Sequence, residues 1–262
     1  MKGEKLSLKL TARLEKIATL VTEGAFLADI GTDHGYIPIY LLNKGVIDRA
    51  VLSDINKGPL DNARSEIKKN NLEKMADLRL GSGLEILDCN EVDEVIIAGM
   101  GGILISEIIK KDLEICKMLN KMILQPMQAP EELRFFLIEN GFEIMDEHLV
   151  NEDFRIYEII ECKYNPKFYE RKIDMKDYKE NLYFEIPQKL IDKKEDLLVE
   201  LINRKLKECE SILKKLSEVE KHLVSKRIDE INTRRHKLKR MLVMIQKENR
   251  YETTKNNRYC KK

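Results

Sequence analysis

Apolar positions in the first 164 residues follow two alternating patterns. Helical spacing predicts an amphipathic helix over residues 10–21. Short apolar runs predict buried strands, and helical patterns separate them, which requires a parallel sheet covered by helices on both faces. The predicted strands span residues 25–30, 48–55, 77–83, 92–102 and 120–127, and the predicted helices span residues 36–45, 60–71, 103–111 and 129–141. Two β-rich runs, 142–150 and 154–164, predict a closing antiparallel hairpin. The fold class is therefore α/β and Rossmann-like, with a mostly parallel seven-stranded sheet.

The pattern changes after Asn165-Pro166. From about residue 189 onward Gly and Pro are absent, and charged residues surround a sparse apolar seam with heptad spacing. The first stripe runs from Ile202 to Leu216 and the second from Val224 to Ile245, and the two are out of register by one residue. An α-helical hairpin explains this shift, and a single long helix with a stutter is the alternative. The expected domains are residues 1–164, a helical coiled-coil domain of residues 165–250, and a polar, flexible tail of residues 251–262.

Charge is divided unevenly between these parts. Residues 1–164 carry 20 Lys and Arg against 29 Asp and Glu, a net charge of −9, whereas residues 165–262 carry 27 against 17, a net charge of +10. Such asymmetry indicates that the basic part faces a polyanion. Long helices rich in Lys and Glu that are merely solvated are the alternative.

Composition argues against several classes of protein. No stretch approaches the roughly 18 apolar residues of a membrane span, and the basic N-terminus lacks the apolar run of a signal peptide. The five cysteines are scattered without a C-x-x-C pair, and the four histidines lack ligand spacing. We therefore expect a cytoplasmic protein with reduced thiols, no metal site and no membrane contact.

The segment LADIGTDHGY, residues 27–36, nearly matches the glycine-rich turn that follows the first strand of nucleotide-binding α/β folds. Gly31 permits the tight turn, and Asp29 can accept hydrogen bonds in the crevice where such sheets bind ligands. Asp54 ends the second strand, 23 residues after Gly31. At about this separation along the sequence, a carboxylate reaches the ribose hydroxyls. Together with Gly81-Ser82-Gly83, these residues indicate a nucleoside-containing ligand. Ordinary turn chemistry is the alternative for any one of them.

Asp33 occupies the place of the middle glycine in this turn. A carboxylate there would repel a phosphate that approaches the loop and the following helix. S-adenosylmethionine has no phosphate and carries an ammonium and a sulfonium, so an acidic loop suits it. The alternative, which is compatible with ligand contact, is that Asp33 caps the helix beginning near Tyr36.

Five segments carry a family resemblance: LTARLEKIA, LADIGTDHGYIPIYL, LSDINKGPLDNA, IIAGMGG and MILQPM. In this order and spacing they resemble the bacterial tRNA (adenine-22-N1)-methyltransferase family. Its members join a class I Rossmann-like methyltransferase domain to a C-terminal coiled coil. The resemblance is close over residues 10–164. Over the remainder it is limited to the helical, coiled-coil character of the sequence. D-I-G-T-D-H-G and A-G-M-G-G are its specific motifs, because generic methyltransferases carry neither.

The resemblance implies S-adenosylmethionine as cofactor, tRNA as partner and adenine N1 as the methylated atom. It assigns the methionine-side loop to Asp29, Gly31, Thr32 and His34. It assigns the ribose and adenine contacts to Asp54, Ile55, Gly81, Ser82 and Gly83. The segment between cofactor and target base is assigned to Ala98, Gly99 and Met100.

The chemistry of adenine N1 fits one departure from other methyltransferases. Many amino-methyltransferases grip an exocyclic nitrogen with an Asn/Asp-Pro-Pro-aromatic loop, where this chain has Ala-Gly-Met-Gly-Gly. N1 has an available lone pair, so alignment with the methyl group is the main requirement. The methylated base is cationic, and a carboxylate would stabilise it and accept its N6 proton. Asp33 is the first candidate, followed by Asp29 and His34.

Basic residues of the helical part are the candidate tRNA contacts, since they can neutralise phosphates without reading sequence. They are Arg204, Lys205, Lys207, Arg234, Arg235, Lys237, Lys239 and Arg240. The first alternative function is methylation of another RNA position, a protein or a small molecule, with the coiled coil as a protein-interaction module. A dinucleotide-dependent oxidoreductase and a non-enzymatic cofactor sensor are further alternatives. We expect a monomer or a weak homodimer.

Overall fold

The computed structural model describes residues 8–170, 180, 182–218 and 220–259. The chain divides into two compact units, residues 1–173 and 174–262. The ends of the expected N-terminal domain and C-terminal tail, residues 1–7 and 260–262, lie outside the described residues.

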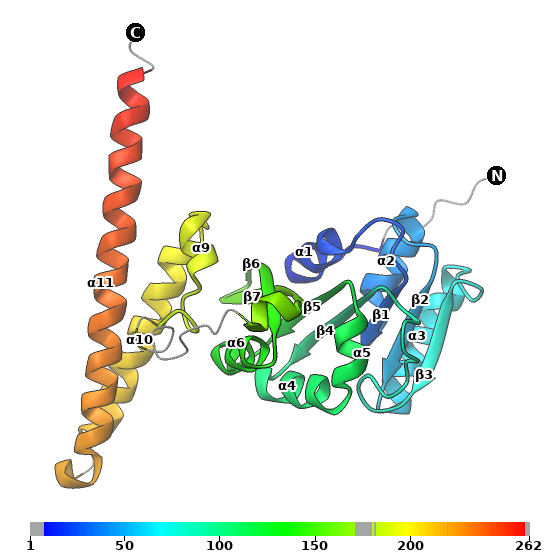
Figure 1. Cartoon of the computed structure of the whole chain (residues 1–262), viewed down its shortest axis with the longest axis horizontal. Coiled ribbons are helices and arrows are strands. Elements are labelled where there is room, and N and C mark those ends of the chain that lie inside the picture. Colours follow the sequence, from blue (N-terminus) through cyan, green and yellow to red (C-terminus); the bar gives the residue numbers. More distant parts are fainter. Residues whose placement is uncertain (1–7, 171–179, 181, 219, 260–262) are drawn as a thin grey trace. The chain divides into compact units, whose positions relative to one another are not determined.

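The first unit alternates strands and helices along the chain (Figure 1). Its strands are β1 (Leu27–Ile30), β2 (Ala50–Asp54), β3 (Ala76–Leu80), β4 (Glu94–Met100), β5 (Lys121–Pro126), β6 (Phe142–Glu152) and β7 (Arg155–Tyr164). Its helices are α1 (Ala12–Leu20), α2 (Tyr36–Lys44), α3 (Lys57–Lys69), α4 (Gly102–Lys111), α5 (Leu113–Met118), α6 (Pro130–Glu139) and α7 (Pro166–Glu170). The predicted α/β order is confirmed.

The seven strands form one sheet in the order β3-β2-β1-β4-β5-β7-β6. Strands β1 to β5 are parallel to one another, whereas β7 is antiparallel to both β5 and β6. The predicted closing hairpin is therefore confirmed. Strand order reverses at β1, which pairs with β2 on one side and β4 on the other. Ligands of open α/β sheets bind at such a reversal, at the carboxyl ends of the strands.

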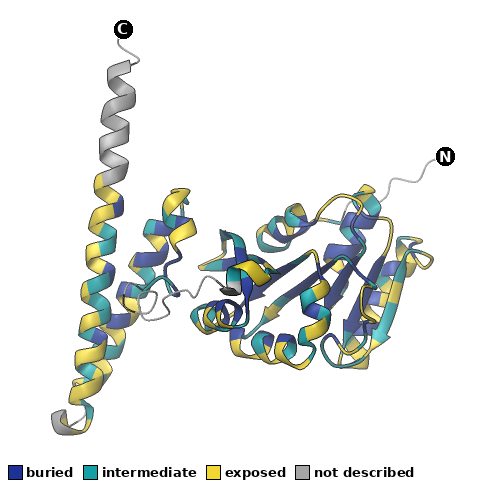
Figure 2. Cartoon of the chain, viewed as in Figure 1, coloured by how far each residue is buried: buried dark blue, intermediate teal, exposed yellow. Residues whose placement is uncertain are grey.

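Helices cover both faces of this sheet, so its central strands are buried (Figure 2). On one face Ile17 of α1, Leu41 of α2 and Ala63 of α3 join alternate strand residues in a single apolar cluster. Ile109 of α4 and Leu137 of α6 are also fully buried. Burial on both faces explains why the strands are continuous apolar runs without polar alternation.

Two local features differ from the sequence prediction. Helix α3 begins at Lys57, three residues before the expected start, so that Pro59 lies within its first turn, where a proline is tolerated. The short helix α5 was not predicted, because six residues are too few for a clear helical period. Cys89, Cys116, Cys162 and Cys209 are free thiols, and Cys260 lies outside the described residues.

The second unit consists of helices α9 (Gln188–Asp192), α10 (Leu198–Leu216) and α11 (Lys221–Tyr259). Helices α10 and α11 pack against each other as an antiparallel pair (Figure 1), so the hairpin reading of the heptad shift is confirmed. Cys209 and Leu238 of the two seams are fully buried. Helix α11 runs to Tyr259, into the segment expected as a tail, and no Gly or Pro interrupts it. Within the described residues, no helix is both long and apolar enough to cross a membrane.

A buried arginine joins α6 to the closing hairpin of the sheet. Nε of Arg134 donates to Oε1 of Glu147 at 2.6 Å, and Nη2 donates to Oε2 of Glu158 at 2.6 Å. Arg134 is 1% exposed, and both carboxylates are buried. The positive charge of the guanidinium therefore balances the negative charges of two carboxylates that have almost no access to water.

We expect Arg134→Met to lower the free energy of unfolding by about 3–5 kcal/mol, because it leaves two buried carboxylates without their cation. Urea unfolding at pH 7 measures the loss. Arg64→Met is the control, because Arg64 pairs with Asp61 on an exposed helix face and should cost less than about 1 kcal/mol. Equal losses in the two variants would contradict the role assigned to Arg134.

Candidate active site

The loop after β1 forms the centre of the candidate site. Gly31 has a φ of +77°, which few residues other than glycine adopt. The N–H groups of Gly31 and Thr32 both donate to the carbonyl oxygen of Ser53 at 2.8 Å, which fixes the turn against the end of β2. Helix α2 then begins at Tyr36, as predicted, with Gly35 as its N-cap residue. Asp33 is therefore not the N-cap, and the capping interpretation is wrong.

Asp29 is the buried carboxylate of this site, at 8% exposure. Burial, reinforced by the nearby Asp54 carboxylate, raises the pKa of Asp29 to about 6. The hydroxyl oxygen of Ser53 is also buried and has no hydrogen-bond partner within the described protein. Buried polar groups without partners are uncommon. A polar ligand at these strand ends would supply the missing partner.

Asp33 lies at the rim of the site, with 77% of its side chain exposed. Its Oδ2 is 3.5 Å from Nε2 of His34, and the His34 ring stacks on Tyr36 with centroids 4.9 Å apart. Water screens an exposed carboxylate, so the expectation that Asp33 repels phosphates at short range through poor screening is weakened. Asp29 is the residue to which that electrostatic argument applies.

The ends of β2 and β3 provide the next groups. Oδ1 of Asp54 accepts a hydrogen bond from the N–H of Asn56 at 2.7 Å, and the N–H of Gly81 donates to the carbonyl oxygen of Asp54. The loop of Gly81, Ser82 and Gly83 is thereby held beside Asp54. Ile55 follows with 66% exposure. The structure thus brings together the residues assigned to ribose and adenine.

The end of β4 contains an irregularity at Gly99. Ala98 pairs with Gln125 and Met100 with Pro126, so Gly99 is an extra residue in the strand, with a φ of +81°. A Cβ at Gly99 would meet no atom within 4 Å, whereas one at Gly31 would lie 2.0 Å from the terminal carbon of Met100. Met100 therefore lies across the Gly31 turn, and Gly99 faces open space.

Gln125 is a site residue that sequence reasoning missed. It is fully buried, and its Oε1 accepts hydrogen bonds from Nη1 of Arg13 at 2.7 Å and from the N–H of Gly99 at 3.2 Å. Gln125 thus links helix α1 to the irregular end of β4. The motif MILQPM contains this residue, but nothing in the local sequence indicates a partner 112 residues away.

Large exposed apolar side chains surround this end of the sheet. They are Tyr36, Ile55, Leu80, Ile103 and Met127. Each lies at or just after the carboxyl end of a strand or in the first turn of the following helix. Exposed apolar groups gathered in one place are typical of a binding surface. Leu80, Ile103 and Met127 were not predicted, because single apolar residues after a strand resemble core positions in sequence.

In the second unit, the predicted basic residues differ in exposure and in pairing. Arg234 is only 20% exposed and binds Glu185, with Nε 2.8 Å from Oε2, so it is removed from the candidate RNA contacts. Arg204 pairs with Glu200 on the surface of α10. Lys207, Lys239 and Arg240 are exposed, and Lys205, Arg235 and Lys237 are partly exposed. Lys237 and Arg240 also line a cavity of about 580 Å³.

The order of the strands and the antiparallel β7 define the first unit as a Rossmann-like methyltransferase fold, with its strand order reversing at β1 and β4, where such sheets bind ligands. Residues 10–160 match the family model described as "Methyltransferase domain". The chain belongs to this family.

Three similar proteins extend the comparison. The sequence is 34% identical over 153 residues to the tRNA (adenine(22)-N(1))-methyltransferase of Bacillus subtilis; the match spans 58% of this chain and 64% of that protein. The crystal structure of the B. subtilis M1A22 tRNA methyltransferase TrmK superposes with a TM-score of 0.78 at 26% identity, covering 90% of this chain and 99% of that one. A putative tRNA (m1A22) methyltransferase of Streptococcus pneumoniae, solved with S-adenosyl-L-methionine, gives 0.76 at 26% identity and covers 89% and 100%.

The raised pKa of Asp29 predicts that the free energy of unfolding depends on pH. Its pKa is about 6 in the folded protein and about 3.9 in the unfolded chain, so the folded state binds its proton more tightly. The contribution of this proton to stability is complete below about pH 4 and is lost as the pH rises through about 6. Without ligand, Asp29→Asn should therefore gain up to about 3 kcal/mol relative to wild type between pH 4 and pH 7.5.

Urea unfolding of wild type and Asp29→Asn at the two pH values measures this gain, and other titrating groups cancel in the comparison. Asp48→Asn is the control, because Asp48 is exposed before β2. A difference between wild type and Asp29→Asn that does not change with pH would contradict the raised pKa.

Proposed function

We propose that this chain is an S-adenosylmethionine-dependent methyltransferase that methylates N1 of adenine 22 in tRNA. The observation that carries the proposal is the group of residues at the β1–β4 reversal, where the buried Asp29 and the partnerless hydroxyl of Ser53 lie beside the Gly31 turn. The named activity of the B. subtilis protein and the cofactor bound by the S. pneumoniae protein support it.

The residues of the crevice fit S-adenosylmethionine. Asp29 would attract the ammonium of the methionine moiety, and Asp54 would bind the ribose hydroxyls. Ile55 offers an exposed apolar surface to adenine, beside the loop of residues 81–83. The bound cofactor supplies an electrophilic methyl group on a sulfonium. The protein must then hold N1 of the target adenine in line with that methyl carbon and its sulfur.

The end of β4 is the proposed place of the target base. Gly99 leaves open space, and Gln125 holds its backbone N–H in a fixed position. Met100 and the exposed Tyr36 and Met127 present apolar surface to a base that leaves its stack. Methylation through the N1 lone pair would leave the product base cationic. Asp33, at the exposed rim, would stabilise that cation and accept its N6 proton.

The helical unit is the proposed tRNA clamp. Its net positive charge and the exposed Lys207, Lys239 and Arg240 suit a phosphate backbone. The paired helices would position the RNA without reading its sequence. In the competing proposal, the first unit methylates another substrate and the helical unit binds a protein instead of tRNA.

Transfer of labelled methyl from S-adenosylmethionine to unmodified tRNA transcripts tests the function. We expect the full chain to incorporate one methyl group, and nuclease mapping to place it on N1 of adenine 22. A transcript with guanine at position 22 is the matched control and should stay unlabelled. Label at another nucleotide would refute the assigned position. Titration that shows binding of NADH but not of S-adenosylmethionine would refute the enzyme class.

Asp33→Asn should lower the single-turnover rate of methyl transfer by about 100-fold or more, as expected when a proton acceptor is lost. The affinity for tRNA should stay within about twofold, because the carboxylate is not a phosphate contact. Filter binding and rapid-quench kinetics measure the two quantities. Asp48→Asn serves as the exposed carboxylate control, and a near-normal rate in Asp33→Asn would remove Asp33 from the chemistry.

A further inference from the structure

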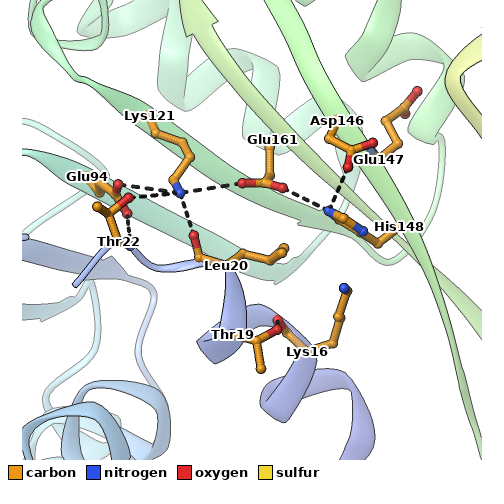
Figure 3. Close-up of polar contacts among 10 residues, drawn as sticks. All are labelled: Lys16, Thr19, Leu20, Thr22, Glu94, Lys121, Asp146, Glu147, His148 and Glu161. Carbon is orange, nitrogen blue, oxygen red and sulfur yellow. Dashed lines mark hydrogen bonds and ion pairs between the residues drawn. The ribbon is translucent and has the colours of Figure 1, made fainter. Parts of the chain in front are cut away.

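A second group of polar residues lies on the closing hairpin, in strands β6 and β7. Asp146 and His148 belong to β6 and Glu161 to β7. Figure 3 shows the carboxylates of Asp146 and Glu161 on either side of the His148 imidazole. Glu161 pairs with Ile123 of β5, near the amino ends of the parallel strands. The group is therefore remote from the carboxyl-end crevice described above.

A register shift in the hairpin creates this group. Ile144 pairs with Cys162, but the next paired residue is Asp146, opposite Glu161, so Met145 is the extra residue of a bulge. Directly opposed residues share a face of a sheet, as do residues two apart along a strand. In a regular register Met145 would pair with Glu161 and Asp146 with Ile160, so Asp146 would lie on the opposite face, which carries Glu158.

Each carboxylate directs one oxygen at the same imidazole nitrogen. Oδ2 of Asp146 is 3.6 Å from Nε2 of His148, and Oε1 of Glu161 is 2.8 Å from it. The second oxygen of each is held elsewhere. Oδ1 of Asp146 accepts a hydrogen bond from the N–H of Glu147 at 2.7 Å, and Oε2 of Glu161 is 3.5 Å from Nζ of Lys121. Such contacts outside the ligand set orient metal ligands in proteins.

The distances and the donor types are those of a divalent transition-metal site. All three donor atoms lie within 4.8 Å of one another. Zinc bonds of about 2.0–2.2 Å in tetrahedral geometry place ligand atoms about 3.3 Å apart, which lies between the two distances measured from Nε2. One imidazole with two carboxylates favours Zn²⁺ over Mg²⁺, which prefers oxygen ligands alone.

Charge and access also suit a cation. Lys121 is close to this group, but its Nζ also lies 3.5 Å from the buried Glu94 and donates to the carbonyl oxygen of Leu20 (Figure 3). The charges of Lys121 and Glu94 offset each other, and Asp146 with Glu161 leave two negative charges for the ion. His148 and Glu161 are 12% and 14% exposed in their side chains, whereas Asp146 is 43% exposed. Ion and water can therefore approach from the Asp146 side.

We propose that Asp146, His148 and Glu161 bind a Zn²⁺ ion that bridges β6 and β7, with water completing its coordination. In this state the lone pair on Nε2 of His148 is directed at the metal. The ion replaces the contacts between imidazole and carboxylates and joins the two strands at the bulge. This site is independent of the proposed methyl transfer.

Thermal unfolding of the full chain, stripped with EDTA and then supplied with Zn²⁺ or Mg²⁺, tests the proposal. Zn²⁺ in about 100-fold excess over its dissociation constant should raise the midpoint of the first unit by about 5 °C, and Mg²⁺ should not. Asp146→Asn and His148→Gln should lose this Zn²⁺-dependent shift. Comparing each variant with and without metal keeps the test valid even where the substitution lowers stability by itself.

Two control variants address other metal-binding groups. Asp153→Asn removes an exposed carboxylate from the β6–β7 turn, and His236→Gln removes an exposed histidine from α11; both should retain the shift. The absorption of bound Co²⁺ should show nitrogen and oxygen ligation without a thiolate band. Absence of a Zn²⁺ shift in wild type, its persistence in His148→Gln, or a thiolate band would each overturn the proposal.

Discussion

The position of β1 in the sheet is the constraint on which the rest of the structure depends. It pairs in parallel with β2 on one side and β4 on the other, so the helices that follow the two neighbouring strands leave the sheet in opposite directions. The loop after β1 therefore lies between the ends of β2 and β4, where sheets of this kind bind ligands. Every group proposed to bind cofactor or base lies at these strand ends or is held there by them.

Much of this arrangement could be predicted from the sequence, because the signals are local. Continuous apolar runs separated by helical patterns require a covered parallel sheet, and the strand-end positions of Asp29, Gly31 and Asp54 follow from that. The exposure of each carboxylate does not follow from local pattern. Asp33 stands out in the motif and is exposed, whereas Asp29 reads as an ordinary strand-end residue and is buried with a raised pKa.

Residues whose roles depend on distant partners could not be predicted. Gln125 lies in an apolar run, and only the pairing of β4 with β5 and the packing of α1 bring Gly99 and Arg13 to its side chain. Arg234 belongs to the most basic segment of the chain, yet Glu185, outside the heptad pattern, binds it. In both cases the sequence shows the type of side chain, and the tertiary fold decides whether it faces a ligand or another residue of the protein.

The closing hairpin connects stability with the candidate site. Its bulge sends Asp146 and Glu161 to one face and keeps Glu147 and Glu158 on the other, where Arg134 binds them. Each of the two groups includes a glutamate of β7, which is the neighbour of β5. Since β5 ends at Gln125 and Pro126, beside the irregular end of β4, a rigid hairpin supports the strand that holds Gly99 in place. Polar groups far from the crevice thereby help to set the backbone position on which alignment of a target base depends.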